Sequence, residues 1–404
     1  MYEFNSNFSK FPGGYLFAVL HQKIDAYKKE NPEARVISLG VGDVTLPLPG
    51  AVVEAMGKAV QEQVYKETFQ GYGSYEGYEF LRKAISENDF APYGVRVGLD
   101  EIFISDGAKS DIASVCDLFS ENNKIAVCDP TYPAYIDTNV IAGRCGSWLE
   151  NEKVWSDVIY LPCVKENDFA PELPEERPDL IYLCFPNNPT GAMISREKLQ
   201  KWVDYANEQG SLILYDAAYE GFISDPALPH TIYECKGAEK CCMEFHSYSK
   251  NAGFTGVRLG YTVIPKTIEN NGVRLNELWR RRLSSKYNGA PYIVQRGAEA
   301  IYTPKGKKEV KEHIAYYKGN TLMILNELKG MGYEVYGGTD SPYIWMKAPN
   351  EMGSWEFFDY LLRNANVVGT PGIGFGPSGA GYFRLTGFGT KEQTQEALNR
   401  IRKL

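Results

Sequence analysis

The sequence predicts an α/β protein whose mostly parallel sheet is covered by helices on both faces. Two observations support this prediction: apolar runs of strand length alternate with amphipathic stretches of helical length, and the strand-like runs lack the polar alternation of a solvated sheet. The strand-like runs are residues 101–105, 124–128, 179–184, 211–219 and 243–247, and the clearest helical stretches are 112–119 and 196–209.

This block of alternating elements predicts a large domain over residues 46–290. After Lys307 the pattern changes to a long amphipathic helix, then strands within 333–338 and 341–348, a further helix and a strand within 382–389. These elements predict a smaller α/β domain. No internal repeat or low-complexity segment interrupts either part.

Composition excludes several classes of protein. A net charge of −8 argues against general nucleic-acid binding, which concentrates positive charge. The N-terminus lacks an apolar signal core, and no run approaches the roughly 20 apolar residues of a membrane helix. The eight cysteines form no C-x-x-C pair, and the four histidines are scattered. We therefore expect a cytoplasmic protein with reduced thiols, no metal site and no membrane partner.

The segment SYSKNAGFTGVRLG, from Ser247 to Gly260, carries the most chemistry. Lys250 follows a strand-like run, where a loop can aim its amine into a cleft, and such a lysine is a Schiff-base candidate. Ser247 and Arg258 offer a hydroxyl and a guanidinium, which both bind phosphate oxygens well. A lone S-x-x-K motif is more often a glycine loop with solvated charges, so other segments must decide.

Asp216 stands where an open parallel sheet presents its carboxyl edge. A buried carboxylate needs a partner, and a protonated ring nitrogen of a pyridine-type cofactor is one such partner. Tyr219 and Asn188, which follow strand-like runs, can donate to the neighbouring ring oxygen. Taken alone, Asp216 is equally consistent with a helix cap.

A glycine turn opening into a helix follows residues 101–105. Gly107, Ala108 and Lys109 would offer backbone N–H groups to an anion there, which makes the turn a phosphate cradle without a P-loop. Tyr132 lies in a proline-punctuated turn after the next strand, where its ring could stack on a flat cofactor. A lone tyrosine in a loop usually only packs against its neighbours, but the position of Tyr132 after a strand end favours a role in the site.

The order of GAK, DPTYPAY, PNNPTG, DAAY and SYSKNAGFTGVRLG resembles the fold-type I aminotransferases, which use pyridoxal 5'-phosphate (PLP). The resemblance covers nearly the whole chain. It implies a seven-stranded sheet in the large domain, a small domain made of residues 1–45 and 291–404, and a homodimer with shared active sites. The implied roles are covalent attachment for Lys250, ring-nitrogen contact for Asp216, O3' contacts for Asn188 and Tyr219, phosphate contacts for Ser247 and Arg258, and stacking for Tyr132.

PGGYLF, ETFQGYG, DGAKSDI, AGFTGVRLG and PGIGFGPSGAGYFRLTGFG resemble the LL-diaminopimelate aminotransferase family. That family interconverts LL-diaminopimelate and tetrahydrodipicolinate, with glutamate and 2-oxoglutarate as the other pair, in a route to lysine. The resemblance implies that Arg384 binds the carboxylate beside the reacting carbon. Further implied contacts to substrate or phosphate are Tyr15, Gly40, Lys109, Asn188 and, from a partner subunit, Tyr72 and Asn288, with Glu62 as a weaker match.

The chain departs from the family's motifs at two places, both near where the distal end of the substrate would bind. The chain has GYGSYEG at residues 71–77 where the family usually has GYGPEQG, and Ala380 where an acidic residue is common. The alternatives are therefore a divergent aminotransferase acting on another amino acid and a PLP-dependent lyase or decarboxylase. A non-catalytic PLP-fold sensor is disfavoured because no helix-turn-helix segment is expected.

Overall fold

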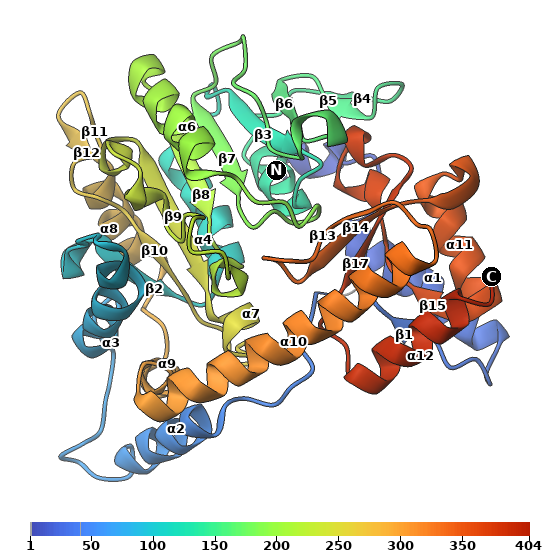
Figure 1. Cartoon of the computed structure of the whole chain (residues 1–404). Helices are drawn as coiled ribbons and strands as arrows, with labels where there is room; N and C mark the ends of the chain where they lie inside the picture. Colours follow the sequence, from blue (N-terminus) through green and yellow to red (C-terminus); the bar gives the residue numbers. More distant parts are fainter. Residues whose placement is uncertain (1, 41) are drawn as a thin grey trace.

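In the computed structural model, residues 2–40 and 42–404 are described. A seven-stranded sheet lies at the centre of this part of the chain, in the order β2-β10-β9-β8-β7-β3-β6 (Figure 1). β10 runs antiparallel to both neighbours, and the other pairs are parallel. The strands are β2 (Ile102–Ser105), β3 (Ile125–Asp129), β6 (Val158–Pro162), β7 (Leu180–Cys184), β8 (Leu212–Asp216), β9 (Cys242–Ser247) and β10 (Gly260–Val263). The predicted mostly parallel sheet is confirmed.

The central strands are apolar because helices cover both of their faces. Every residue of β3 and β7 is buried, as parallel strands between two helical layers require. The apolar side of α6 (Arg196–Gln209) packs into the core on one face. α4 (Ala108–Val115), α5 (Pro133–Ile141) and α8 (Leu275–Lys286) pack into the core on the other face.

α6 illustrates how local signals set an element. Ser195 caps its start by accepting a hydrogen bond from the Lys198 amide at 3.1 Å. Gly210 ends it in the left-handed conformation, with φ of 66°. The remaining helices are α1 (Leu16–Glu30), α2 (Gly50–Glu62), α3 (Glu79–Ile85), α7 (Tyr248–Asn251), α9 (Tyr292–Ala300), α10 (Pro304–Gly330), α11 (Ser354–Ala365) and α12 (Lys391–Ile401).

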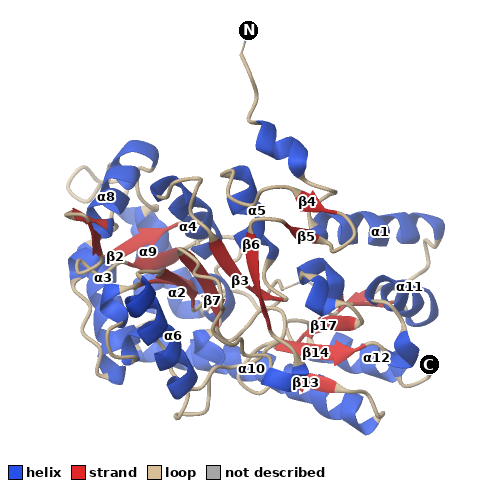
Figure 2. Cartoon of the chain, turned by 90° about the horizontal axis from the view of Figure 1, so that it is seen from above, coloured by secondary structure: helices blue, strands red, loops and turns tan. Residues whose placement is uncertain are grey.

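A second, antiparallel sheet has the order β13-β14-β17-β16, with α1, α11 and α12 around it (Figure 2). Its strands are β13 (Val335–Gly337), β14 (Tyr343–Lys347), β16 (Thr370–Pro371) and β17 (Tyr382–Thr386). The strand β1 (Ile37–Ser38) pairs in parallel with β15 (Val367–Val368), so a segment from the first tenth of the chain joins the C-terminal part beside this sheet. The exact domain boundaries stay a prediction. Two short hairpins complete the strands: β4 (Trp148–Leu149) with β5 (Val154–Trp155), and β11 (Glu269–Asn270) with β12 (Val273–Arg274).

The 27-residue helix α10 connects the two sheets (Figure 1). It packs against α2 near its beginning and against β13 and β14 further along. The carboxyl ends of the parallel strands face the region between the two sheets, where open α/β sheets place their ligands. Within residues 2–40 and 42–404, no helix combines the length and apolar character needed to cross a membrane.

Truncating the buried face of α10 should destabilise the whole fold. Ile324→Ala removes a side chain with no solvent exposure, and we expect it to lower the free energy of unfolding by about 2–5 kcal/mol. Leu322→Ala, on the same helix but 39% exposed, should cost much less. Urea denaturation of both variants measures the difference, and equal losses would contradict the assigned packing of α10.

Candidate active site

A cavity of about 370 Å³ lies between the strand ends of the large sheet and the small sheet. Its wall combines residues from segments that are far apart in the sequence. The predicted site residues in the wall are Ala108, Lys109, Tyr132, Asn188, Asp216, Tyr219, Ser247, Lys250, Arg258 and Arg384. The structure therefore brings together most of the residues that the sequence singled out.

Lys250 lies on α7, directly after β9. Ser247 caps this short helix by accepting a hydrogen bond from the Ser249 amide at 3.2 Å. The Lys250 amine donates to the carbonyl oxygen of Gly42. Burial, together with the nearby guanidinium groups of Arg384 and Arg258, lowers the pKa of this amine to about 8, against the opposing charge of Asp43. A neutral, nucleophilic amine is therefore much more accessible near pH 7 than for an ordinary lysine.

Asp216, the last residue of β8, is held as a buried acceptor. The hydroxyl of Tyr135 donates to Oδ2 at 2.7 Å, and the Ala218 amide donates to Oδ1 at 3.0 Å. Burial raises the pKa of Asp216, and these two hydrogen bonds oppose the rise by favouring the charged form. A cationic group bound beside Asp216 would stabilise the carboxylate further.

The turn between β2 and α4 lets the Arg258 guanidinium lie close to the backbone of Gly107. Gly107 has φ of 129°, and a side chain there would collide with the guanidinium of Arg258. Ala108 and Lys109 are the first residues of α4, so their amides have no acceptor within the helix. The amide of Gly107 donates instead to Ser105 Oγ at 3.2 Å. The open amides of this turn are therefore those of Ala108 and Lys109.

Tyr219 and Tyr343 form a hydroxyl pair within the wall, at 2.6 Å. Asn188 contributes differently, because its Oδ1 accepts from Nη1 of Arg384 at 2.5 Å. This bond orients the Asn188 side chain so that its amide nitrogen remains the group that can donate to a ligand.

Arg384 is almost completely buried, with 1% exposure. Its Nη2 donates to the Gly40 carbonyl at 2.8 Å, and the rings of Tyr343 and Phe375 lie 4.5 and 4.9 Å from the guanidinium carbon. Nε has no hydrogen-bond partner among the described residues. No carboxylate pairs with this cation there, so an anionic ligand would supply the missing charge and acceptor.

Tyr15 lies outside the cavity wall but contacts Lys109, which is part of it. The Lys109 amine donates to the Tyr15 hydroxyl at 3.3 Å and lies 4.6 Å from the centre of its ring. Gly40 contributes backbone only, since a Cβ there would be 2.6 Å from the carbonyl carbon of Gly369.

Six predicted residues lie outside this cavity wall in a single chain: Gly107, Tyr15 and Gly40, described above, and Tyr72, Asn288 and Glu62. Tyr72 is 89% exposed, Asn288 is exposed, and Glu62 accepts from the Tyr292 hydroxyl at 2.6 Å. The departures at Ser74, Tyr75 and Ala380 are exposed as well and do not line the cavity. The roles of Tyr72 and Asn288 in a partner's site stay predictions.

The wall also contains residues that sequence reasoning did not single out, namely Phe17, His21, Asp43, Tyr135, Ser249 and Tyr343. Tyr135 stands within the DPTYPAY motif, so a signal was present. Tyr343 had only a strand pattern, and its partner Tyr219 is 124 residues away in the sequence.

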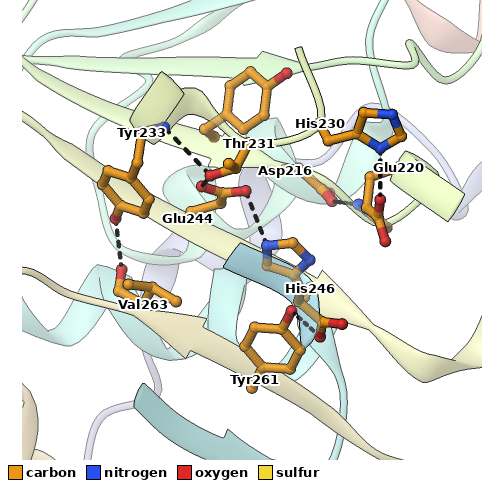
Figure 3. Close-up of polar contacts among 12 residues, drawn as sticks. Asp216, Glu220, His230, Thr231, Tyr233, Glu244, His246, Tyr261 and Val263 are labelled. Carbon is orange, nitrogen blue, oxygen red and sulfur yellow. Dashed lines mark hydrogen bonds and ion pairs between the residues drawn. The ribbon is translucent and has the colours of Figure 1, made fainter. Parts of the chain in front are cut away.

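A buried polar cluster supports β9 beneath the site (Figure 3). Glu244 accepts from the Thr231 hydroxyl at 2.5 Å and contacts Nε2 of His246 at 2.9 Å. The His246 ring stacks on Tyr261 of the neighbouring strand, with centroids 4.4 Å apart. This cluster gives His246 structural partners, and no group of potential metal ligands occurs within the described residues.

The fold and the cavity place a partly buried lysine in one cavity with a buried carboxylate and the glycine turn that opens α4. The model of the family "Aminotransferase class I and II" matches residues 34–401. The chain belongs to this family and has the fold-type I architecture expected for it. It is therefore an aminotransferase.

Individual members of this family are similar to the chain over its full length. The chain is 58% identical to the LL-diaminopimelate aminotransferase of Lachnospira eligens and 56% identical to that of Agathobacter rectalis, in both cases over 404 residues and 100% of each chain. The solved structure of L,L-diaminopimelate aminotransferase from Chlamydomonas reinhardtii is similar with a TM-score of 0.95 and 42% identity, covering 100% of this chain and 98% of that one.

The lowered pKa of Lys250 predicts an unusual pH dependence of labelling. In cofactor-free protein, reaction of Lys250 with a trace acylating reagent should reach half its maximal rate near pH 8, because only the neutral amine reacts. An ordinary lysine would require a pH near 10.4. Asp43→Asn, which removes the opposing charge, should move the midpoint lower still. Peptide mass spectrometry measures the rates, and a midpoint above 10 would contradict the assignment.

Proposed function

We propose that this chain is a PLP-dependent aminotransferase that interconverts LL-diaminopimelate and tetrahydrodipicolinate, with 2-oxoglutarate and glutamate as the other amino-group pair, in lysine biosynthesis. The observation that carries the proposal is the single cavity joining Lys250, Asp216, Arg258 and Arg384. The full-length similarity to LL-diaminopimelate aminotransferases supports the choice of substrate.

The residues present fit PLP. Ala108, Lys109, Ser247 and Arg258 would hold the phosphate, because they combine open amides, a hydroxyl and a guanidinium beside a glycine turn. Asp216 would hold the protonated ring nitrogen, since its buried carboxylate lacks a cation. Asn188 and Tyr219 would contact the ring oxygen, and Tyr132 would stack on the ring.

When bound, PLP supplies an electron sink for the bond that breaks at the substrate's Cα. The Nζ atom of Lys250 would accept the Cα proton and later release it, which an amine with a pKa of about 8 can do near neutral pH. Arg384, whose buried Nε has no hydrogen-bond partner among the described residues, would bind the carboxylate beside the reacting carbon. Asp216 would hold the protonated ring nitrogen, and the hydrogen bonds from Tyr135 and Ala218 favour the charged form that this needs.

Substrate selection depends on the groups that bind the end of the substrate away from the reacting carbon. LL-diaminopimelate is a dicarboxylate, so its distal carboxylate needs a second cation or donor set. Lys109 and Tyr15, joined at 3.3 Å, offer such a set within the chain. Tyr72 and Asn288 of a partner subunit would complete it.

Binding of LL-diaminopimelate should be visible in the cofactor spectrum. We expect both LL-diaminopimelate and glutamate to convert bound PLP to its amino form, with ping-pong kinetics, because the cofactor carries the amino group between half-reactions. Lys250→Ala should abolish turnover, while Lys240→Ala, at the surface, serves as control. If glutamate alone converts the cofactor, the proposed aminotransferase activity stands but LL-diaminopimelate is not the substrate. Release of ammonia or fragments in place of a 2-oxo acid would indicate a lyase.

We further propose that the protein is cytoplasmic and that it forms a homodimer in which each subunit contributes residues to the active site of the other. An exposed apolar surface on α2 and the segment after it supports a partner contact there, and it includes Val53, Val60, Val64, Tyr65 and Phe69. Tyr72 follows this surface directly. The backbone oxygen of Ser74 lies 2.9 Å from the Cβ position of Gly289, so the segments of Tyr72 and Asn288 are neighbours.

Mixed dimers test the sharing. Neither Tyr72→Ala nor Lys250→Ala should retain full activity alone, but mixing the two unfolded variants and refolding them should restore about one quarter of wild-type activity, because half of the dimers are hybrids with one intact site. Mixing Tyr219→Ala with Lys250→Ala is the matched control. Both residues belong to the same chain's site, so no hybrid is intact. Equal behaviour of the two mixtures would contradict the shared site.

A further inference from the structure

The turn between β2 and α4 is fixed from beneath by three buried polar side chains outside the cavity wall. Ser105 ends β2, Thr262 lies on the neighbouring strand β10, and Asp111 lies in the first half of α4. They are 4%, 0% and 3% exposed. Polar groups this deeply buried cost stability unless they are paired, so their pairing is informative.

Their hydrogen bonds form a chain with a defined direction. The hydroxyls of Ser105 and Thr262 donate to the same oxygen, Oδ2 of Asp111, at 2.6 and 2.8 Å. Because the only hydroxyl hydrogen of Ser105 is used in this way, its oxygen is free to accept, and it accepts from the Gly107 amide at 3.2 Å. Burial raises the pKa of Asp111 to about 7, and the two hydroxyl bonds oppose that rise.

Gly107 is therefore held from two sides. Ser105 fixes the direction of its amide, and the guanidinium of Arg258 lies where a side chain would otherwise be. The next two amides, those of Ala108 and Lys109, are the ones open to a ligand. Their positions follow from the orientation of the Gly107 peptide, since the helix begins at the next residue.

We propose that Ser105 and Asp111 are positioning residues for the phosphate of the cofactor, acting through Gly107 on the amides of Ala108 and Lys109. This inference rests on the proposed use of PLP. The Thr262 hydroxyl bonds to the same carboxylate oxygen, but among the described residues its side chain makes no hydrogen bond to the turn. A Thr262 variant therefore distinguishes a role of this cluster in phosphate binding from a role in general stability.

The experiment compares the dissociation constants of PLP and pyridoxal for cofactor-free protein by equilibrium dialysis. Pyridoxal has the same ring and aldehyde but no phosphate. Ser105→Ala should weaken PLP binding about tenfold, the effect of one lost hydrogen bond in the chain, and leave pyridoxal binding unchanged. Thr262→Val, which also removes one hydroxyl from Asp111, should leave both constants within about twofold of wild type.

Asp111→Asn provides a second variant with almost no change of shape. Its amide oxygen can still accept from Ser105, so we expect PLP binding to remain close to wild type, whereas Asp111→Leu should weaken it as Ser105→Ala does. Equal losses in Ser105→Ala and Thr262→Val would overturn the proposal, as would equal losses for PLP and pyridoxal. A wild-type protein that shows no preference for PLP over pyridoxal would instead reject the proposed cofactor itself.

Discussion

The buried guanidinium of Arg384 is the interaction on which the architecture of the cavity depends. It lies on β17 of the small sheet, donates to the backbone of Gly40 in the N-terminal segment, and donates to Asn188 at the end of β7 in the large sheet. A buried guanidinium is costly unless its donors are paired, and Nη1 and Nη2 are paired here with Asn188 and Gly40. Three separate parts of the chain are therefore held at one point, and the cavity is the space that remains between them.

The charges around that point explain the reactivity of Lys250. Burial is the main reason for the lowered pKa of this amine, and Arg384 and Arg258 add to it while Asp43 opposes it, so the lysine loses its proton more easily. The same arrangement leaves an excess of positive charge facing a cavity whose buried anion is Asp216. An anionic, phosphate-bearing cofactor and a dicarboxylate substrate complement this distribution. Reactivity and ligand preference thus have one electrostatic origin.

The strands and the site segments were predictable because their signals are local. β7 and β8 read as short apolar runs, α6 has both of its caps in the sequence, and a site residue follows the carboxyl end of each parallel strand that reaches the cavity. Residue type and position after a strand made Lys250 and Asp216 candidates, and the order of motifs along the chain supplied their predicted roles. The partners Tyr135 and Tyr343 could not be assigned in this way, because a tyrosine in a helix or strand has the same local pattern whether it packs or donates.

The sequence by itself determined the fold class, the family and the identities of the residues at the strand ends, because periodicity, caps and motif order are properties of neighbouring residues. Only the tertiary structure decided which hydrogen bonds those residues make. Asn188 turns its oxygen to Arg384, which is 196 residues away, and Gly107 directs its amide to Ser105 rather than to the cavity. Such choices depend on how buried donors and acceptors are shared across packed elements, since each hydrogen can be used only once.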